Sequence, residues 1–105
     1  MFTTETEQSG RTLHVRDFCP AVGVWESSSA GTTNGALACY LLRHGLIAPD
    51  GSGAIDVVAE QGLEIKRAST VQSRLSANET GIARLQVVGV ATRLIEGHLE
   101  LPEKT

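Results

Sequence analysis

The sequence predicts an α+β protein in which an antiparallel-rich, curled sheet surrounds one central buried helix. Residues 31–44 are apolar at helical spacing and carry almost no charge, which predicts a helix that is enclosed on most sides. Residues 13–18, 55–65 and 71–88 alternate apolar with polar side chains, which is typical of strands. Because only one helix is predicted, the strands are expected to bury it.

The length of 105 residues is enough for one small domain. We expect residues 1–10 to be a polar lead-in and residues 11–105 to form that domain. With 41% hydrophobic and 20% charged residues, the composition is that of a globular protein. The net charge of −3, without a basic cluster, argues against nucleic acid and anionic membranes as partners. The acidic N-terminus shows no signal peptide, so we expect a cytoplasmic protein.

The cysteines and histidines predict no bridge and no metal site. Cys19 and Cys39 are expected to be free thiols, because two cysteines make a poor disulfide framework. The histidines at positions 14, 44 and 98 are scattered, and none pairs with a cysteine or carboxylate at zinc-ligand spacing.

The first strand is predicted over residues 13–18, with Leu13 and Val15 on one face. Pro20 and Gly23 then interrupt regular structure before a loop of small, hydroxyl-bearing residues. Serine side chains accept hydrogen bonds from the free N–H groups at helix starts, so this loop supplies candidate N-caps.

The helix itself is predicted over about residues 31–44 from the spacing of its apolar positions. Gly45 fits the C′ position, where a left-handed residue ends many helices. The side opposite the apolar face also carries small or apolar residues, so we expect the helix to be buried along most of its length. The apolar face is predicted to consist of Ala36, Leu37, Tyr40 and Leu41.

The strands that follow the helix are predicted from alternation and turn residues. Residues 55–65 form one long strand in this interpretation, with Gly62 as a bend or bulge. Residues 71–88 predict a hairpin that turns at residues 78–81. About five strands result, which is near the usual number for one open sheet. Two further segments are expected to continue the sheet, residues 90–95 and 98–101.

The junction between loop and helix is the main chemical feature of the sequence. The first turn of a helix has N–H groups without intrahelical partners and carries a partial positive charge. A small anion such as a carboxylate can bind there without a basic side chain. By composition alone, a capped helix start after a flexible turn is the commoner explanation of the same residues.

Two neighbouring features also have two interpretations each. Glu26 is either a general base or a solvated carboxylate at the end of a strand. The pair Gln61–Gly62 either lines a pocket or forms a strand bulge. The sequence has no Gly-x-Ser-x-Gly elbow and no P-loop, so neither a hydrolase nucleophile nor a nucleotide-phosphate loop is supported.

Several ordered motifs resemble the phenazine-biosynthesis-like (PhzF) family. Residues 26–41 are similar, without a gap, to that family's signature Glu-Asp-Pro-Ala-Thr-Gly-Ser-Ala-Asn-Gly-Ala-Leu-Ala-Ala-Tyr-Leu. Residues 15–24 resemble its Arg-x-Phe-x-Pro segment, and residues 59–69 resemble its Gln-Gly and Gly-Arg-Pro-Ser segment. Residues 87–91 and 96–97 resemble its closing strands. The resemblance covers nearly the whole chain, from about residue 13 to residue 101.

This resemblance implies the diaminopimelate-epimerase-like fold, which has two similar halves, each a curled sheet around a central helix. The chain corresponds to the later part of the second half, a partial half-barrel. In the family the active site lies between the halves and faces the helix starts. Members are isomerases that act on small carboxylate substrates without a cofactor. The resemblance therefore implies a small carboxylate ligand and no cofactor.

The family's functional positions are only partly matched. Its Asp corresponds to Ser27, its Gly to Gly31 and its Ser to Thr32. The catalytic Cys of the wider epimerase fold corresponds to Ala30. These four residues are the predicted substrate-binding site, whereas the catalytic residues stay unassigned. Ser27 cannot carry a proton as an Asp does at neutral pH, and the family's Glu belongs to the first half.

Our leading functional hypothesis is therefore the C-terminal part of a PhzF-like isomerase, with no turnover expected from this chain alone. The alternative is a non-catalytic module that binds a small ligand or another subunit. The chain corresponds to a fragment, a remnant or one subunit of a split enzyme. We expect it to pair with a first half or to self-associate as a dimer, because one sheet cannot cover all sides of the helix. The residues expected to need cover are Val57, Leu63, Ile65 and the helix face 37–41.

Overall fold

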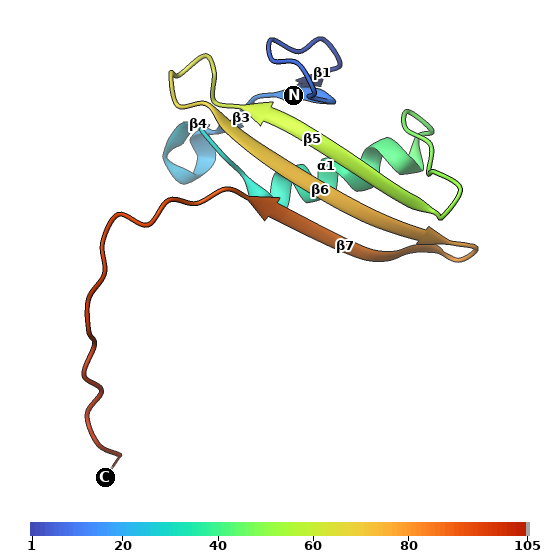
Figure 1. Ribbon diagram of the computed structural model, residues 1–105. Coiled ribbons are helices and arrows are strands. Elements are labelled where there is room, and N and C mark those ends of the chain that lie inside the picture. The colour runs from blue at the N-terminus through green and yellow to red at the C-terminus, as the bar shows by residue number, and fades with distance from the viewer. Residues whose placement is uncertain (105) are drawn as a thin grey trace.

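The computed structural model describes residues 1–104 and contains one α-helix, one 3₁₀ helix and seven strands in that part of the chain. The prediction of an α+β protein with a mostly antiparallel sheet is confirmed (Figure 1). The elements in chain order are β1 (Phe2–Thr3), β2 (Leu13–Val15), β3 (Asp17–Cys19), η1 (Pro20–Val22), β4 (Val24–Ser27), α1 (Gly31–Arg43), β5 (Ala54–Gln61), β6 (Ser69–Asn78) and β7 (Gly81–Gly89).

Five strands form one sheet in the order β1-β2-β5-β6-β7, and β3 pairs with β4 in a separate ribbon. Strand β2 runs parallel to β5, with Leu13 opposite Ala59, and every other pair in the sheet is antiparallel. The parallel pair exists because the chain crosses from β2 to β5 through α1, and a parallel connection needs such a crossover. Figure 1 shows α1 lying along one face of the sheet.

The core lies between α1 and the sheet. Leu13 and Val15 are both buried, which confirms their predicted placement on one face. Alternate residues of β5 and β6 join them, since side chains point to one face at every second position. The fully assembled cluster consists of Leu13, Val15, Ala38, Leu41, Ile55, Val57, Ala59 and Leu75.

The predicted helix is confirmed, but its buried face is not the predicted one. Tyr40 is 48% exposed and Ala36 is also exposed, whereas Leu41 is buried as expected. The sheet covers α1 from one side only, so the helix is not buried along most of its length. The buried residues of α1 are Asn34, Gly35, Ala38 and Leu41.

The two ends of α1 test the predicted caps. Gly45 adopts a left-handed conformation (φ 67°) and its N–H bonds to Leu42 O at 3.1 Å, which confirms the C′ prediction. The prediction of a serine N-cap is wrong, because the N-cap is Ala30 and no side chain caps the helix start. The serines instead bond within their own loop or accept hydrogen bonds through their backbone carbonyls.

The long strand predicted for residues 55–65 stops at Gln61. Gly62 is left-handed (φ 82°), and the chain then turns back, with the N–H of Arg67 bonded to Gly62 O at 2.9 Å. The prediction that the strand continues through Leu63 and Ile65 is therefore wrong. The hairpin of β6 and β7 is confirmed, with Asn78 opposite Gly81 at its turn.

Residues 90–104 form neither strand nor helix, so the predicted segments 90–95 and 98–101 do not continue the sheet. This segment leads away from the body of the molecule (Figure 1). Strand β7 is consequently an edge strand, and all its residues are exposed.

The expectation that Val57 needs cover is also wrong, since its side chain is only 3% exposed beneath α1. The exposed apolar surface lies elsewhere, because the apolar residues Ile55, Val57 and Ala59 of β5 are buried in the core. It gathers on β7, on the segment that follows and around β4. Its members with large exposure include Trp25, Val88, Val90, Leu94, Ile95, Leu99 and Leu101.

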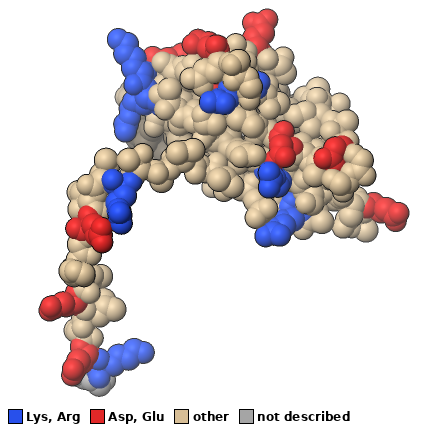
Figure 2. Space-filling model, viewed as in Figure 1, with Lys and Arg blue, Asp and Glu red and all other residues tan. Residues whose placement is uncertain are grey.

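Residues 1–10, expected as a lead-in, add the short edge strand β1, in which Phe2 pairs with Val15. Both cysteines are free thiols, as predicted. Charged groups of both signs are scattered over the face shown in Figure 2, with wide uncharged areas between them. Within residues 1–104, no helix has the length and apolar character needed to cross a membrane.

Candidate functional site

The loop that leads into α1 is fixed by side chains from β5 and β6. Gln61, at the end of β5, donates from Nε2 to Ser27 O at 2.9 Å. Ser69, at the start of β6, donates from Oγ to Ser28 O at 2.7 Å. A Cβ atom on Gly62 would lie only 2.8 Å from Ser28 O, so glycine is required for this close approach. The two loop carbonyls are therefore held against the strand ends.

The first turn of α1 is fixed by the same glutamine. Asn34 donates from Nδ2 to Gln61 Oε1 at 2.8 Å and to Ala30 O at 2.7 Å. Both amide side chains are buried, with Asn34 3% and Gln61 0% exposed. Gln61 thus joins the end of β4 to the first turn of the helix. Of the two interpretations of Gln61, neither a pocket wall nor a bulge is correct, because the side chain is a buried brace.

This brace leaves the N–H groups at the helix start available. Those of Gly31, Thr32 and Thr33 precede the first intrahelical donor, Asn34, whose N–H bonds to Ala30 O at 3.3 Å. No side chain caps them, and the first turn carries no acidic residue of its own. Gly31 and Thr32 are exposed, so a small anion has access to both.

The other predicted site residues are placed nearby but differ in availability. Ser27 Oγ donates to Ser29 O at 3.0 Å, so its hydroxyl is used in a local turn. Ala30 is the N-cap residue and is half-buried. The structure brings all four predicted residues to one helix start, where Gly31 and Thr32 offer backbone donors.

One carboxylate already lies beside this helix start. Thr33 Oγ1 donates to Asp17 Oδ2 at 3.1 Å, and Asp17 belongs to β3. A negative charge is favourable near the positive end of the helix dipole. Asp17 bonds the hydroxyl and not a backbone N–H, so the helix donors stay free while the local field is partly neutralised.

Glu26 is neither a free base nor a solvated carboxylate. Arg16 donates to both of its oxygens, from Nε to Oε1 at 2.9 Å and from Nη2 to Oε2 at 3.0 Å. The carboxylate side chain is only 8% exposed. The hydrogen bonds from Arg16 hold the pKa of Glu26 below its ordinary value, so it stays ionised and paired. Its role is to tie β4 to the strand end at Arg16.

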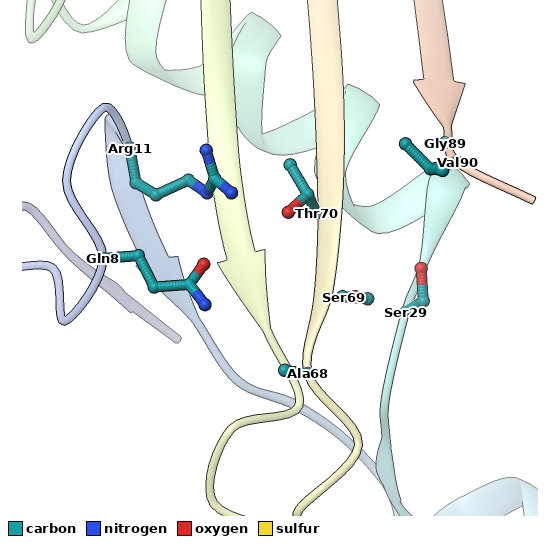
Figure 3. A pocket seen from close by; sticks show the side chains of 8 residues that line it. All are labelled: Gln8, Arg11, Ser29, Ala68, Ser69, Thr70, Gly89 and Val90. Carbon is teal, nitrogen blue, oxygen red and sulfur yellow. The ribbon is translucent and has the colours of Figure 1, made fainter.

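An open pocket of about 460 Å³ lies next to this site, at the start of β6 (Figure 3). Of the predicted site residues none lines it, although Ser29 of the same loop does. Arg11 supplies its only charged side chain, and the Nε of Arg11 is buried without a hydrogen-bond partner. The residues around the pocket are Gln8, Arg11, Ser29, Ala68, Ser69, Thr70, Gly89 and Val90.

Sequence reasoning missed Arg11 and Gln8, because they were assigned to a lead-in or to its border. The only signal in the sequence is a lone arginine directly before an alternating strand. Nothing in its neighbours indicates which hydroxyls it approaches, since Ser69 and Thr70 are almost sixty residues away in the chain.

A second polar cluster consists of His14 on β2 with Glu60 and Glu64. His14 Nδ1 donates to Glu60 Oε1 at 2.8 Å, while Nε2 faces Glu64 Oε1. The hydrogen bonds to Glu60 and Glu64 raise the pKa of His14 above 6.5. Glu60 is fully buried and also accepts from the N–H groups of Glu7 and Gln8, at 2.6 and 3.0 Å.

The shifted pKa values of His14, Glu60 and Glu64 favour the charged form of each side chain. Burial alone raises the pKa of Glu60, but the N–H of Glu7 and the imidazole outweigh it and hold that pKa below 4.5. Burial likewise opposes ionisation of Glu64, and the hydrogen bond from His14 lowers its pKa overall. The described residues include no group of three or more histidine, cysteine or acidic side chains that could hold a metal ion.

The family model described as phenazine biosynthesis-like protein matches residues 1–97 of the chain. The chain belongs to the phenazine biosynthesis-like (PhzF) family. A trans-2,3-dihydro-3-hydroxyanthranilate isomerase of Pseudomonas chlororaphis is 36% identical over 81 residues, which cover 77% of this chain and 28% of that protein. The isomerase of the same name from Pseudomonas aeruginosa is 34% identical over 93 residues, which cover 89% of this chain and 32% of that protein.

An uncharacterized isomerase of Clostridium acetobutylicum is 29% identical over 101 residues, which cover 96% of this chain and 33% of that protein. The PhzF-like chain therefore spans about a third or less of the length of these relatives. Relatives named as isomerases support an isomerase-type function for the family to which the chain belongs.

Proposed function

We propose that this chain is the C-terminal part of a PhzF-like isomerase and that the start of α1 holds the carboxylate of a small substrate. The braced loop supports this proposal most directly. Gln61 and Asn34 are buried on either side of the loop–helix junction, and together they leave the N–H groups of Gly31 and Thr32 exposed. A preorganised set of backbone donors binds an anion without first being ordered.

We expect no turnover from this chain alone. Proton transfer at a substrate carbon needs a positioned acid and base. Ser27 stands where the family has an Asp, and the carboxylate of Glu26 is occupied by Arg16. A partner must therefore supply acid–base groups, and we propose a first half of the diaminopimelate-epimerase-like fold that faces the helix start. No cofactor is required by this chemistry.

A titration followed by NMR tests the carboxylate site. Adding sodium acetate should shift the backbone N–H signals of residues 31–33 in a saturable way, and the affinity should fall as chloride rises. Gly31→Val should abolish these shifts while preserving the fold, since a Cβ there would meet only Val87 Cγ1 at 3.9 Å. Gly51→Val is the matched control, because a Cβ at Gly51 meets nothing within 4 Å and lies in a remote turn. The proposal is contradicted if acetate causes no shifts at residues 31–33 of the wild-type chain.

The second candidate is a non-catalytic module that binds a small ligand or another subunit. The serine at position 27 favours it, because the hydroxyl of Ser27 is bonded to Ser29 O and has no acid–base partner. The two candidates differ in one measurement. Racemisation or isomerisation of a small carboxylate on addition of a separately expressed first half of a family member supports the enzyme, and binding without turnover supports the module.

A further inference from the structure

The pocket beside the loop contains one buried polar atom, Arg11 Nε, that no other group in residues 1–104 satisfies. Arg11 makes no hydrogen bond or ion pair through its side chain among residues 1–104, although its Nε is buried. Gln8 and Ser29 line the same pocket and are exposed, and Thr70 is half-buried, so their polar side chains are accessible from it. A buried guanidinium N–H that has no acceptor destabilises the fold, so an acceptor from a ligand would remove that cost.

The lining indicates the charge and shape of this ligand. No carboxylate lines the pocket, and Arg11 is its one charged group. A guanidinium presents parallel N–H donors that match the two oxygens of a carboxylate. In Figure 3 the side chains of Arg11 and Gln8 lie on one side of the pocket, Ser29 lies on the other, and Thr70 lies between them.

Ser69 adds a requirement on the rest of the ligand. Its hydroxyl proton is used in the bond to Ser28 O, so toward the pocket Ser69 Oγ offers only lone pairs. A hydroxyl or ammonium group on the ligand would meet that acceptor. The pocket thus combines one site for a carboxylate with one acceptor for a donor group.

We propose that this pocket is a second binding site, which takes a small hydroxy- or amino-carboxylate with its carboxylate on Arg11. The site is separate from the helix start, because neither Gly31 nor Thr32 lines it. It goes beyond the proposed function, since Arg11 lies outside the signature stretch at residues 26–41. The pocket and the unpaired Nε of Arg11 are present whether or not the helix start binds an anion.

The test is a titration of the full chain with sodium lactate, a small hydroxy-carboxylate, observed by NMR. The side-chain Nε–H of Arg11 and the backbone N–H of Thr70 should shift in a saturable way. Arg11→Gln should weaken this binding about tenfold or more, because both parallel donors are lost. Arg11→Lys keeps the positive charge but loses the planar fork, so it should also weaken lactate binding; it provides the test if Arg11→Gln does not fold.

Arg84→Gln is the matched control, since Arg84 is an exposed arginine on β7 outside the pocket lining. It should leave lactate affinity unchanged. Gly31→Val, which blocks the helix start, should leave the Arg11 shifts in place, and this separates failure of one site from failure of the other. Four outcomes would each overturn the proposal. Lactate affinity could be unchanged in both Arg11 variants, or sodium chloride could cause equal shifts. Phosphate could bind more tightly than lactate in an Arg11-dependent way, or the Arg11 shifts could be lost in Gly31→Val.

Discussion

The amide side chains of Asn34 and Gln61 share a hydrogen bond of 2.8 Å across the core, between the first turn of α1 and the last residue of β5. The two residues are 27 positions apart in the chain. Gln61 also donates from Nε2 to Ser27 O, so one side chain fixes the position of both the loop and the helix start. Buried amides of this kind stabilise a unique arrangement only when every group has a partner.

Gln61→Leu should therefore destabilise the protein by about 2 kcal/mol, because Ser27 O loses its buried donor and Asn34 loses an acceptor. Urea denaturation measures the loss. Gln86→Leu is the matched control, since Gln86 is exposed on β7, and it should change the free energy of unfolding by less than about 0.5 kcal/mol. Equal effects of the two substitutions would show that the buried network contributes nothing beyond the exposed site.

Gly62→Ala should cost about 3 kcal/mol or more, because a left-handed alanine is strained and its Cβ would lie 2.3 Å from Arg67 O. Gly10→Ala separates these causes. Gly10 is also left-handed (φ 73°), but its Cβ would meet nothing within 4 Å, so only the backbone strain of about 1 kcal/mol remains. Thermal unfolding of both variants should rank Gly62→Ala as clearly the less stable, and a reversed order contradicts the predicted clash with Arg67 O.

Asp17→Asn should strengthen acetate binding at the helix start severalfold. Asp17 Oδ2 accepts from Thr33 Oγ1, so its negative charge lies beside the proposed anion site. The amide keeps an oxygen acceptor for the threonine hydroxyl and removes only the charge. The dissociation constant is measured by the same NMR titration at low salt, where charge effects are largest. Asp56→Asn on the exposed face of β5 should leave that constant unchanged.

The triad of His14, Glu60 and Glu64 predicts a pH window for stability. The pKa of His14 is raised by its carboxylate partners, so its contribution is complete below 6.5 and is lost as pH rises through the raised value. The pKa values of Glu60 and Glu64 are lowered, so their contributions are complete above 4.5 and are lost as pH falls through the lowered values. The triad therefore stabilises most between pH 4.5 and 6.5.

His14→Gln should remove the decline in stability that begins just above pH 6.5, since the raised pKa of His14 is what makes folding take up a proton in that range. It should also cost about 2 kcal/mol inside the window, because Glu60 loses a charged hydrogen bond. Urea denaturation across the pH range gives both numbers. His98→Gln, in the exposed segment after β7, is the control and should preserve the wild-type profile.

Self-association stays a prediction, and the structure moves it to the edge of the sheet. Strand β7 has an unpaired edge, and Val88 and Ile95 are 54% and 89% exposed. Such surfaces pair with other chains. Sedimentation at micromolar concentration should show a dimer or a larger species, and Val88→Lys should shift it toward the monomer. Ser76→Lys, on the interior strand β6, should not. A stable wild-type monomer would contradict the prediction.

The sequence by itself determined the type of each main element. The spacing of residues 31–44, the alternation in residues 71–88 and the glycine at position 45 are local signals, and α1, the hairpin and the C′ turn follow from them. Local signals did not predict where β5 ends. Alternation continues through Ile65, yet β5 ends at Gln61 because Gly62 is left-handed and the chain then turns back, with the N–H of Arg67 bonded to Gly62 O.

The motif in residues 26–41 likewise identified the helix start as the candidate site and indicated the family, because side chains at fixed spacing carry that information. The tertiary structure decided the rest. Which face of α1 is buried depends on which side the sheet covers, and both faces are apolar in sequence. The roles of Glu26, Gln61 and Arg11 depend on partners brought from other strands, so a pattern of neighbouring residues could not reveal them.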